Sequence, residues 1–203
     1  MEFRSAQPSD AKLASRLLFD SFPQKAAFII GLGSESRGKY ILEKLFPIPD
    51  HRLSHTHTEM AVLKGQVIGL CTFFPGRMLP KLDRQLDRLL LRQYPLRGKI
   101  ALILRGYPLI FIKEAARDEV FISNMAVKKR MQNHGVEEKI LDHIGESAKE
   151  LGISKLSVMV NIDSRDTRQV FEQHGFKVEA MHLESNRRVV HLGSGYLKMV
   201  KKL

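Results

Sequence analysis

The residues best placed to do chemistry lie between Asn124 and Val136, where a basic loop containing one glycine joins a predicted strand to a predicted helix. The first turn of a helix directs unpaired backbone N–H groups toward one point, where the positive end of the helix dipole also lies. Phosphate groups bind there without needing a particular side chain. Gly135 lacks a Cβ, so the backbone can approach such a group closely. We therefore predict a pocket for a phosphorylated cofactor.

The composition is that of a soluble globular protein with one domain, residues 1–203. Apolar residues make up 43% of the chain and charged residues 27%, which argues against disorder. The only cysteine is Cys71, so neither an internal disulfide nor a cysteine-based zinc site is expected. The N-terminus lacks an apolar signal core, and the most apolar run, 100–112, is too short and too interrupted to span a bilayer. We expect a cytoplasmic protein that does not interact with membranes.

The formal net charge of +11 favours an anionic partner. Nucleic acid is the least supported of the candidates, because the basic residues are spread along the chain and Trp is absent, which leaves few rings to stack on bases. A basic enzyme with an anionic cofactor fits the same charge.

Hydrophobic spacing predicts a mixed order of strands and helices. The expected strands cover residues 3–6, 58–63, 67–74, 120–127, 156–160, 176–183 and 189–200. The expected helices begin at Asp10, cover 38–46 and 136–151, and run from Asp163 or Ser164 to Gly175. Residues 77–117 differ in character and predict two or three short helices that form an insertion. The pattern indicates a mixed α/β fold with antiparallel hairpins.

Two motifs in this order resemble the GNAT superfamily of N-acetyltransferases. The first is the triplet Met125-Ala126-Val127 followed by the loop 132–137 at the start of a helix. The second is the strand 156–160 followed by Ser164, Phe171 and the pair Gly175-Phe176. The resemblance covers most of the chain outside 77–117. It implies the GNAT fold: a central mixed, mostly antiparallel sheet flanked by helices, with a helical insertion between the third and fourth strands.

The resemblance also implies acetyl-CoA as the cosubstrate, with no metal. The loop would supply amides to the pyrophosphate, and the pantetheine arm would pair with the exposed edge of the triplet. Lys128, Lys129 and Arg130 would add favourable charge, unless they only form a solvated basic surface. The cofactor-binding residues that we expect are Met125, Ala126, Val127, Gln132, Asn133, His134, Gly135, Val136, Glu137, Lys139, Ser164 and Phe171.

Three positions depart from the family pattern. Glu137 stands where the family prefers Gly or Ala, and its charge would repel a bound phosphate although it suits a helix N-terminus. Phe171 replaces a Tyr that is often proposed to protonate the leaving thiolate, and Phe has no proton to donate. Ser164 replaces the usual Asn. These departures imply an outward-pointing Glu137, a low cofactor affinity, or the loss of cofactor binding.

Acetyl transfer needs a neutral amine and a polarised thioester carbonyl. A backbone N–H near Val127, where strands of the family bulge, is the expected polarising group. Glu119 is the expected general base, because strand alternation places it on the same face as Phe121, Ser123, Met125 and Val127. The weaker candidates for proton transfer are Ser123, Ser164, His182 and His191.

Other reactive side chains are better explained as structural. Cys71 lies mid-strand without a surrounding motif, so a buried inert thiol is favoured over an acyl-enzyme nucleophile. His55 and His57 are spaced for a metal on one strand face, but no third ligand is evident, and we expect no metal site.

The sequence thus favours an acyl-CoA-dependent N-acyltransferase that acts by direct transfer in a ternary complex. The acceptor would be a primary amine of a small molecule or a peptide. The alternative is a non-catalytic GNAT-like module that binds acyl-CoA and acts in regulation. Residues 77–117 are expected to select the acceptor, or else to form a packing appendage or a homodimer contact.

Overall fold

The computed structural model describes residues 1–106, 112–132, 134–183 and 193–203. Seven strands form one sheet in the order β1-β2-β3-β4-β5-β7-β6. Neighbouring strands are antiparallel except β4 and β5, which are parallel. The strands are β1 Glu2–Ser5, β2 Thr58–Leu63, β3 Gln66–Pro75, β4 Val120–Val127, β5 Lys155–Asn161, β6 Lys177–Leu183 and β7 Gly195–Lys202.

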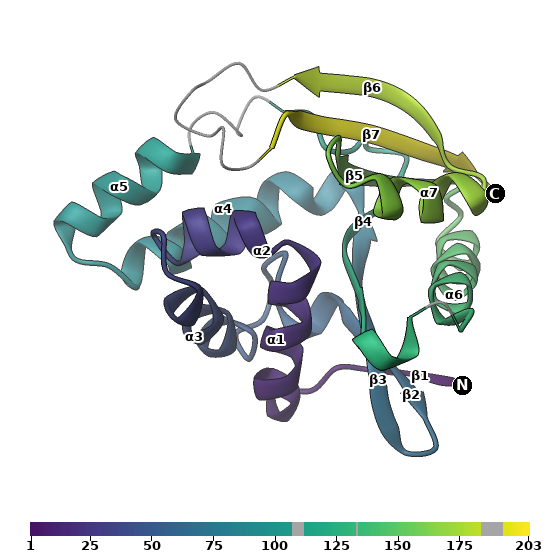
Figure 1. The fold of residues 1–203 in the computed structure, drawn as a ribbon, viewed down its shortest axis with the longest axis horizontal. Helices are drawn as coiled ribbons and strands as arrows, with labels where there is room; N and C mark the ends of the chain where they lie inside the picture. The colour runs from purple at the N-terminus through teal and green to yellow at the C-terminus, as the bar shows by residue number, and fades with distance from the viewer. Residues whose placement is uncertain (107–111, 133, 184–192) are drawn as a thin grey trace.

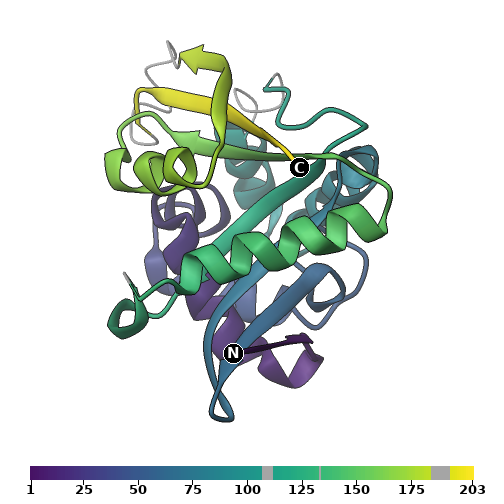
Figure 2. The same cartoon turned by 90° about the vertical axis from the view of Figure 1, so that its right-hand side faces the viewer.

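Helices cover both faces of the sheet (Figure 1, Figure 2). The helices α6 and α7 pack on one face, and Figure 2 shows α6 lying across the strands. The other face carries α1 to α5. The helices are α1 Ala11–Ser21, α2 Pro23–Lys25, α3 Glu35–Leu45, α4 Leu79–Arg92, α5 Leu96–Gly106, α6 Val136–Glu150 and α7 Arg165–Gln173, with a π-helical turn at Ala26–Ile30.

Each face of the sheet has its own hydrophobic core. Ile140, Leu141 and Ile144 recur at helical spacing and are buried against β3, β4 and β5. On the opposite face, Leu17 and Leu18 of α1 join a core that includes residues of β2, β3 and α3. The strands alternate between these two cores, which fixes the face on which each side chain of β4 lies.

The predicted strands and helices are largely present. Strands 58–63 and 120–127 have the predicted bounds, and the insertion contains α4 and α5 between β3 and β4. Within the described residues the last strand begins at Gly195, and residues 189–192 of the predicted strand lie outside the described residues. The second long helix begins earlier than predicted, at Glu35, because the Ser34 hydroxyl accepts a hydrogen bond from the Arg37 amide.

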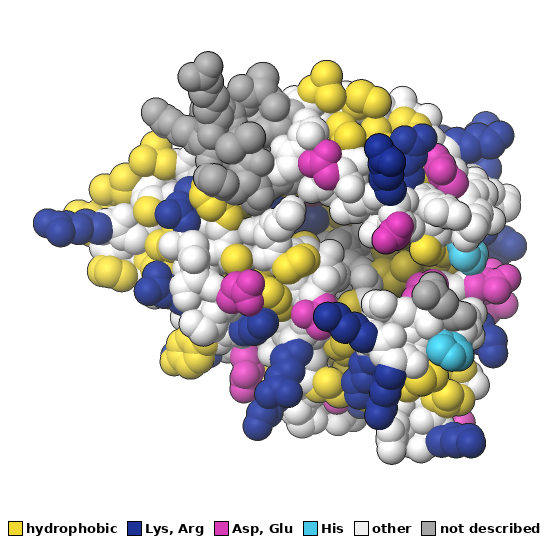
Figure 3. Space-filling view, viewed as in Figure 1, with side chains coloured by type: hydrophobic (Ala, Val, Ile, Leu, Met, Phe, Trp, Pro, Cys, Tyr) yellow, Lys and Arg dark blue, Asp and Glu magenta, His cyan; other side chains and the backbone are white. Residues whose placement is uncertain are grey.

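None of the helices in the described part of the chain has both the length and the hydropathy of a membrane span. On the face shown in Figure 3, Lys and Arg side chains lie among Asp and Glu side chains and do not gather into one basic patch.

Candidate functional site

The loop after β4 is tied to the end of that strand. The side-chain amide of Gln132 donates to the carbonyl of Val127 at 3.1 Å, and the Met131 amide donates to the carbonyl of Lys128 at 2.7 Å. Gly135 ends the loop with φ 72° and ψ 16°, a left-handed conformation that favours glycine. The conformation of Gly135 therefore sets the direction in which the chain enters α6.

The start of α6 presents backbone donors to an open space. The first helical hydrogen bond runs from the Lys139 amide to the carbonyl of Gly135, so the amides of Val136, Glu137 and Glu138 precede the helical ladder. Among the described residues, the only atom within 4 Å of a Cβ placed on Gly135 would be Oε2 of Glu138, at 3.9 Å. The backbone at Gly135 is therefore open to approach, and the contact with a pyrophosphate there stays a prediction.

The side chains around this opening are mostly exposed. Lys129, Arg130, His134 and Lys139 are all exposed, and the Val136 side chain is buried in the core. Arg130 donates to Oε1 of Gln66, the first residue of β3, at 3.2 Å. The predicted cofactor contact Asn133 lies outside the described residues.

The first turn of α6 carries two acidic residues, Glu137 and Glu138, and the carboxylate of Glu138 lies nearer to Gly135. The sequence singled out Glu137 as the charge that would oppose a phosphate, whereas the carboxylate near Gly135 belongs to Glu138. Glu138 is therefore the acidic residue whose carboxylate lies beside the opening at Gly135.

Beside this loop, β4 separates from β5. Their pairing covers only Val120 to Ile122 of β4, although β4 continues to Val127. Within the described residues, the β5-side edge of β4 beyond Ile122 therefore lacks a strand partner. An unpaired edge accepts an extended ligand as an added strand, which suits the predicted pantetheine contact at Met125, Ala126 and Val127.

The bulge of β4 lies at Ser123 and not near Val127, where it was predicted. Thr72 of β3 pairs with Asn124 and the next residue, Phe73, pairs with Ile122, so Ser123 is the extra residue. A bulge places two consecutive side chains toward the same face, and Ser123 and Asn124 both line one cavity.

The bulge also reverses the alternation of side chains beyond it. Phe121 faces the cavity, whereas Met125 and Val127 pack against the core under α6. The prediction that Met125 and Val127 share a face with Phe121 and Ser123 is therefore wrong, because it assumed an uninterrupted strand.

Glu119 occupies a buried ion pair and does not line this cavity. Its side chain is 2% exposed; Lys198 donates to Oε1 at 2.9 Å, and the Ala116 amide donates to Oε2 at 2.7 Å. Burial acts to raise the pKa of Glu119, but the Ala116 amide and Lys198 outweigh it and lower that pKa. Both oxygens are engaged, so we no longer assign Glu119 as the general base.

The cavity beside the bulge has a volume of about 520 Å³. It lies between the sheet and the helices of the first half of the chain. Apolar side chains form most of its wall, and its charged side chains come from four separate segments. Among the described residues, the charged lining consists of Lys25, Arg52, Asp83, Asp87 and Glu114.

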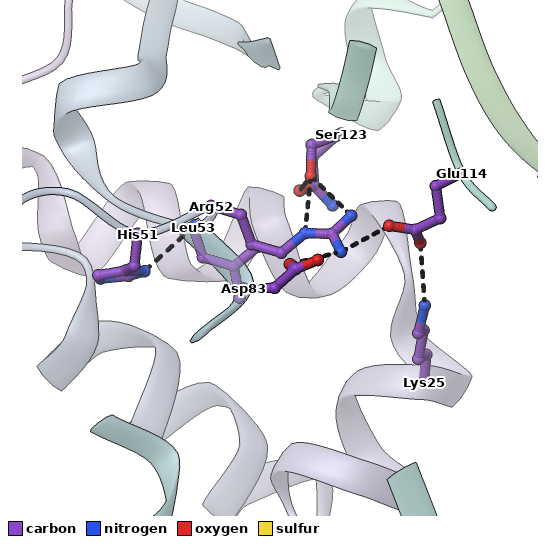
Figure 4. Close-up of polar contacts among 8 residues, drawn as sticks. Lys25, His51, Arg52, Leu53, Asp83, Glu114 and Ser123 are labelled. Carbon is purple, nitrogen blue, oxygen red and sulfur yellow. Dashed lines mark hydrogen bonds and ion pairs between the residues drawn. The ribbon is translucent and has the colours of Figure 1, made fainter. Parts of the chain in front are cut away.

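Arg52 holds this charged lining together (Figure 4). Its Nη1 donates to Oε2 of Glu114 at 2.7 Å and to Oδ1 of Asp83 at 3.0 Å. Its Nε and Nη2 reach Oγ of Ser123 at 3.4 Å, which connects the cluster to the bulge. Lys25 lies 3.7 Å from Oε1 of Glu114. The cluster therefore joins α2, α4, the segment before β4 and β4 itself.

The two carboxylates bound to Arg52 differ in their pKa. Burial acts to raise the pKa of Glu114, but Arg52 and Lys25 outweigh it and lower that pKa. Burial raises the pKa of Asp83, and Arg52 opposes only part of that effect. Burial lowers the pKa of Lys25, although Glu114 acts against it. Asp83 is thus the stronger base of the two carboxylates.

His51 fixes the segment that carries Arg52. Its Nδ1 accepts from the Leu53 amide at 3.2 Å, so its Nε2 carries the proton and donates to the carbonyl of Leu45 at 3.0 Å. The side chain is fully buried, and burial lowers the pKa of His51. The neutral imidazole is the form that this arrangement needs.

The remaining sequence candidates lie outside the cavity. Phe171 is 3% exposed, and its ring meets that of Phe176 edge-on at a centroid distance of 5.1 Å in the core under α6. Ser164 directly precedes α7 without a capping hydrogen bond from its side chain. Their contact with a cofactor stays a prediction. Burial raises the pKa of the Cys71 thiol, so the thiolate needed for an acyl-enzyme is disfavoured.

The histidine candidates also have structural positions. His55 hydrogen-bonds the carbonyl of Phe46, and the His57 ring packs edge-on against Phe74. His182 lies in β6, and His191 lies outside the described residues.

No protein-family model and no curated protein sequence matches this chain. Solved structures do match it. An N-acetyltransferase from Staphylococcus aureus Mu50 is similar with a TM-score of 0.77 and 18% identity, over 98% of this chain and 100% of that one. The PaiA N-acetyltransferase from Thermoplasma acidophilum, in complex with coenzyme A, has a TM-score of 0.53 and 13% identity, over 100% and 98% of the two chains.

An acetyltransferase of the GNAT family from Streptococcus pneumoniae is similar with a TM-score of 0.51 and 17% identity, over 100% of this chain and 98% of that one. At identities this low, the likeness establishes the fold alone. The fold predicted from the two sequence motifs is confirmed.

Proposed function

We propose that this chain, whose fold is that of the GNAT acetyltransferases, transfers an acetyl group from acetyl-CoA to a primary amine by direct attack in a ternary complex. One observation carries the proposal. The unpaired edge of β4 leads from the Gly135 opening to the bulge at Ser123, and the charged cavity begins at that bulge. An anionic cosubstrate and a separate acceptor would meet there.

The loop side would hold the cosubstrate mainly through its backbone. The first amides of α6 would bind the pyrophosphate, and Lys129 and Lys139 are exposed nearby to add charge. The pantetheine arm would lie along Met125 to Val127 as an added strand. The thioester carbonyl would then be polarised by a backbone N–H at the bulge, which moves this role from Val127 to the neighbourhood of Ser123.

Asp83 is our candidate for the general base in place of Glu119. It lines the cavity and its pKa is raised by burial. Among the described residues, Arg52 contacts only Oδ1 of Asp83, so Oδ2 is left to accept a proton from the ammonium through water. Glu114 is less suited, because both its oxygens face cations and its pKa is lowered.

The non-catalytic alternative has one observation in its favour. Phe171 is a buried core residue and has no proton to give a leaving thiolate. A transferase of this kind would need a proton donor other than Phe171 for the leaving thiolate.

Two measurements separate these alternatives. Calorimetry with acetyl-CoA tests cofactor binding, and release of free thiol in the presence of a panel of primary amines tests transfer. Binding with amine-dependent thiol release supports the enzyme. Binding without release from any amine supports the regulatory module. No heat of binding at millimolar acetyl-CoA would rule out both.

A further inference from the structure

The cavity beside the bulge is polar at one end and apolar at the other. Its charged side chains gather around Arg52, next to Ser123 of β4. Most of the apolar side chains in the wall come from the π-helical turn, α4 and α5: Ile29, Ile30, Leu79, Leu86, Leu90, Leu91, Leu102 and Ile103. A ligand that fills the cavity must therefore carry its charge at the end near the bulge and an apolar body at the other end.

The charged end favours a cation. Of the charged side chains that line the described part of the cavity, Asp83, Asp87 and Glu114 are acidic, and Lys25 and Arg52 are basic. The lining thus carries one net negative charge. Arg52 already binds two carboxylates, and Lys25 faces Glu114. Both cations therefore already have carboxylate partners within the lining.

Asp87 supplies the unbalanced charge. It lies one helical turn after Asp83 on α4, and within the described residues no hydrogen bond or ion pair engages its carboxylate. Asp87 is exposed and also lines the cavity, so an ammonium group that enters from solvent can meet its carboxylate. A ligand carboxylate placed there would meet three acidic side chains.

We propose that the acceptor is a small amphipathic amine, with one ammonium group, an apolar body that lies between α4 and α5, and no carboxylate next to the amine. This proposal rests on the proposed function, because it assigns the acceptor of the same site. A cavity of about 520 Å³ suits a small molecule. The proposal disfavours free amino acids, hydrophilic diamines and the amino groups of intact proteins.

Three related amines test the two ends of the cavity separately. Pentylamine has the proposed character. Norleucine is the same molecule with a carboxylate next to the amine, and putrescine has a second ammonium in place of the terminal methyl. NMR titration of the full chain without acetyl-CoA measures their binding. We expect pentylamine to bind at least about 10-fold more tightly than either relative, because each relative places an unpaired charge in the cavity.

A charge reversal at Asp87 tests whether its carboxylate selects against a ligand carboxylate. The measured quantity is the ratio of two affinities, so the test does not depend on how tightly either amine binds. Asp87→Lys should lower the ratio of pentylamine to norleucine affinity by about 10-fold, because the net charge of the lining becomes positive. Glu150→Lys makes the same change in total charge at the exposed end of α6, on the other face of the sheet. That control should keep the wild-type ratio.

The results of the amine titrations can be told apart from the results of the acetyl-transfer assay. The preference for pentylamine without thiol release from acetyl-CoA would overturn the proposed function and leave the ligand assignment intact. Equal binding of the three amines, tighter binding of norleucine or putrescine, or no binding of pentylamine would overturn the ligand assignment. An unchanged ratio in Asp87→Lys would remove Asp87 from the site.

Discussion

The loop before α6 and the cluster around Arg52 lie on either side of β4 and are built in opposite ways. The loop site uses one short stretch of sequence, because its backbone donors are the amides of Val136, Glu137 and Glu138 at the start of α6. The cluster joins side chains from Lys25, Arg52, Asp83, Glu114 and Ser123, and side-chain contacts across the fold hold it in place. The first site depends on local conformation, and the second depends on tertiary contacts.

This difference implies different sensitivities to mutation. A site made of backbone amides loses ligand binding when a substitution places a side chain in its opening. Such a substitution need not disturb the packing of the fold. A buried side-chain cluster contributes to folding itself, because each member satisfies the charge of another.

Removing the charge of Arg52 should have the largest effect on folding. Arg52→Met leaves Asp83 and Glu114 without their shared partner, and breaking a buried ion pair in this way costs about 3–5 kcal/mol of unfolding free energy. Urea unfolding measures the loss. The control is Arg168→Met, which breaks the exposed pair with Glu172 on α7 and should cost no more than about 0.5 kcal/mol. Equal losses in the two variants would show that the Arg52 cluster does not stabilise the fold.

Filling the loop should abolish cosubstrate binding. Gly135→Glu places a side chain and a negative charge where the pyrophosphate is expected, so acetyl-CoA affinity should fall by at least about 100-fold in calorimetry. The left-handed backbone also costs a side chain about 1–2 kcal/mol.

Gly152→Glu is a matched control for that backbone strain. Gly152 has φ 70°, follows the other end of α6, and a Cβ there meets no described residue within 4 Å. It should lose similar stability and keep wild-type affinity. Normal acetyl-CoA affinity in Gly135→Glu would show that the loop is not the phosphate site.

Acid should weaken the fold through His51. Its pKa is lowered in the folded state, so below about pH 6.5 the unfolded chain binds a proton that the folded chain does not, and stability falls as the pH decreases toward the folded-state pKa. The contribution is at most about 1.4 kcal/mol per pH unit. Urea unfolding should be measured at several pH values below about 6.5. The free energy of unfolding should fall less steeply with decreasing pH in His51→Gln than in the wild type. An unchanged slope would assign the acid sensitivity to other groups.

Neutralising the acidic first turn of α6 should have the smallest effect. Glu138→Gln should tighten acetyl-CoA binding by roughly two- to fivefold, because the Glu138 carboxylate is the nearest one to Gly135. Glu137→Gln should tighten it less. Both should lower stability by about 0.3–1 kcal/mol, since they remove a favourable charge from the helix N-terminus. A larger gain in affinity from Glu137→Gln than from Glu138→Gln would show that Glu137 is the carboxylate that opposes acetyl-CoA binding more strongly.

The elements that the sequence predicted are those with strong local patterns. Strand alternation gave the bounds of β2 and β4, and helical spacing together with Gly135 gave the start of α6. The bulge at Ser123 was misplaced, because an extra residue is visible only in the pairing with β3. That misplacement also put Met125 and Val127 on the wrong face.

The charged cluster had no detectable signal in the sequence. Asp83 and Asp87 lie on the polar face of an amphipathic helix, where charges normally indicate solvent. Arg52 follows a buried histidine in an irregular segment, and Glu114 lies outside any strand or helix. Glu119 had the stronger sequence argument, but the fold pairs it with Lys198, 79 residues away.

The sequence alone determined the fold class and the start of α6 after Gly135, because both depend on residues close together in the chain. Tertiary structure alone decided which carboxylates line the cavity and which is buried in an ion pair. The physical reason is that backbone conformation follows from neighbouring residues, whereas burial, charge pairing and the pKa of each carboxyl depend on segments that meet only after folding.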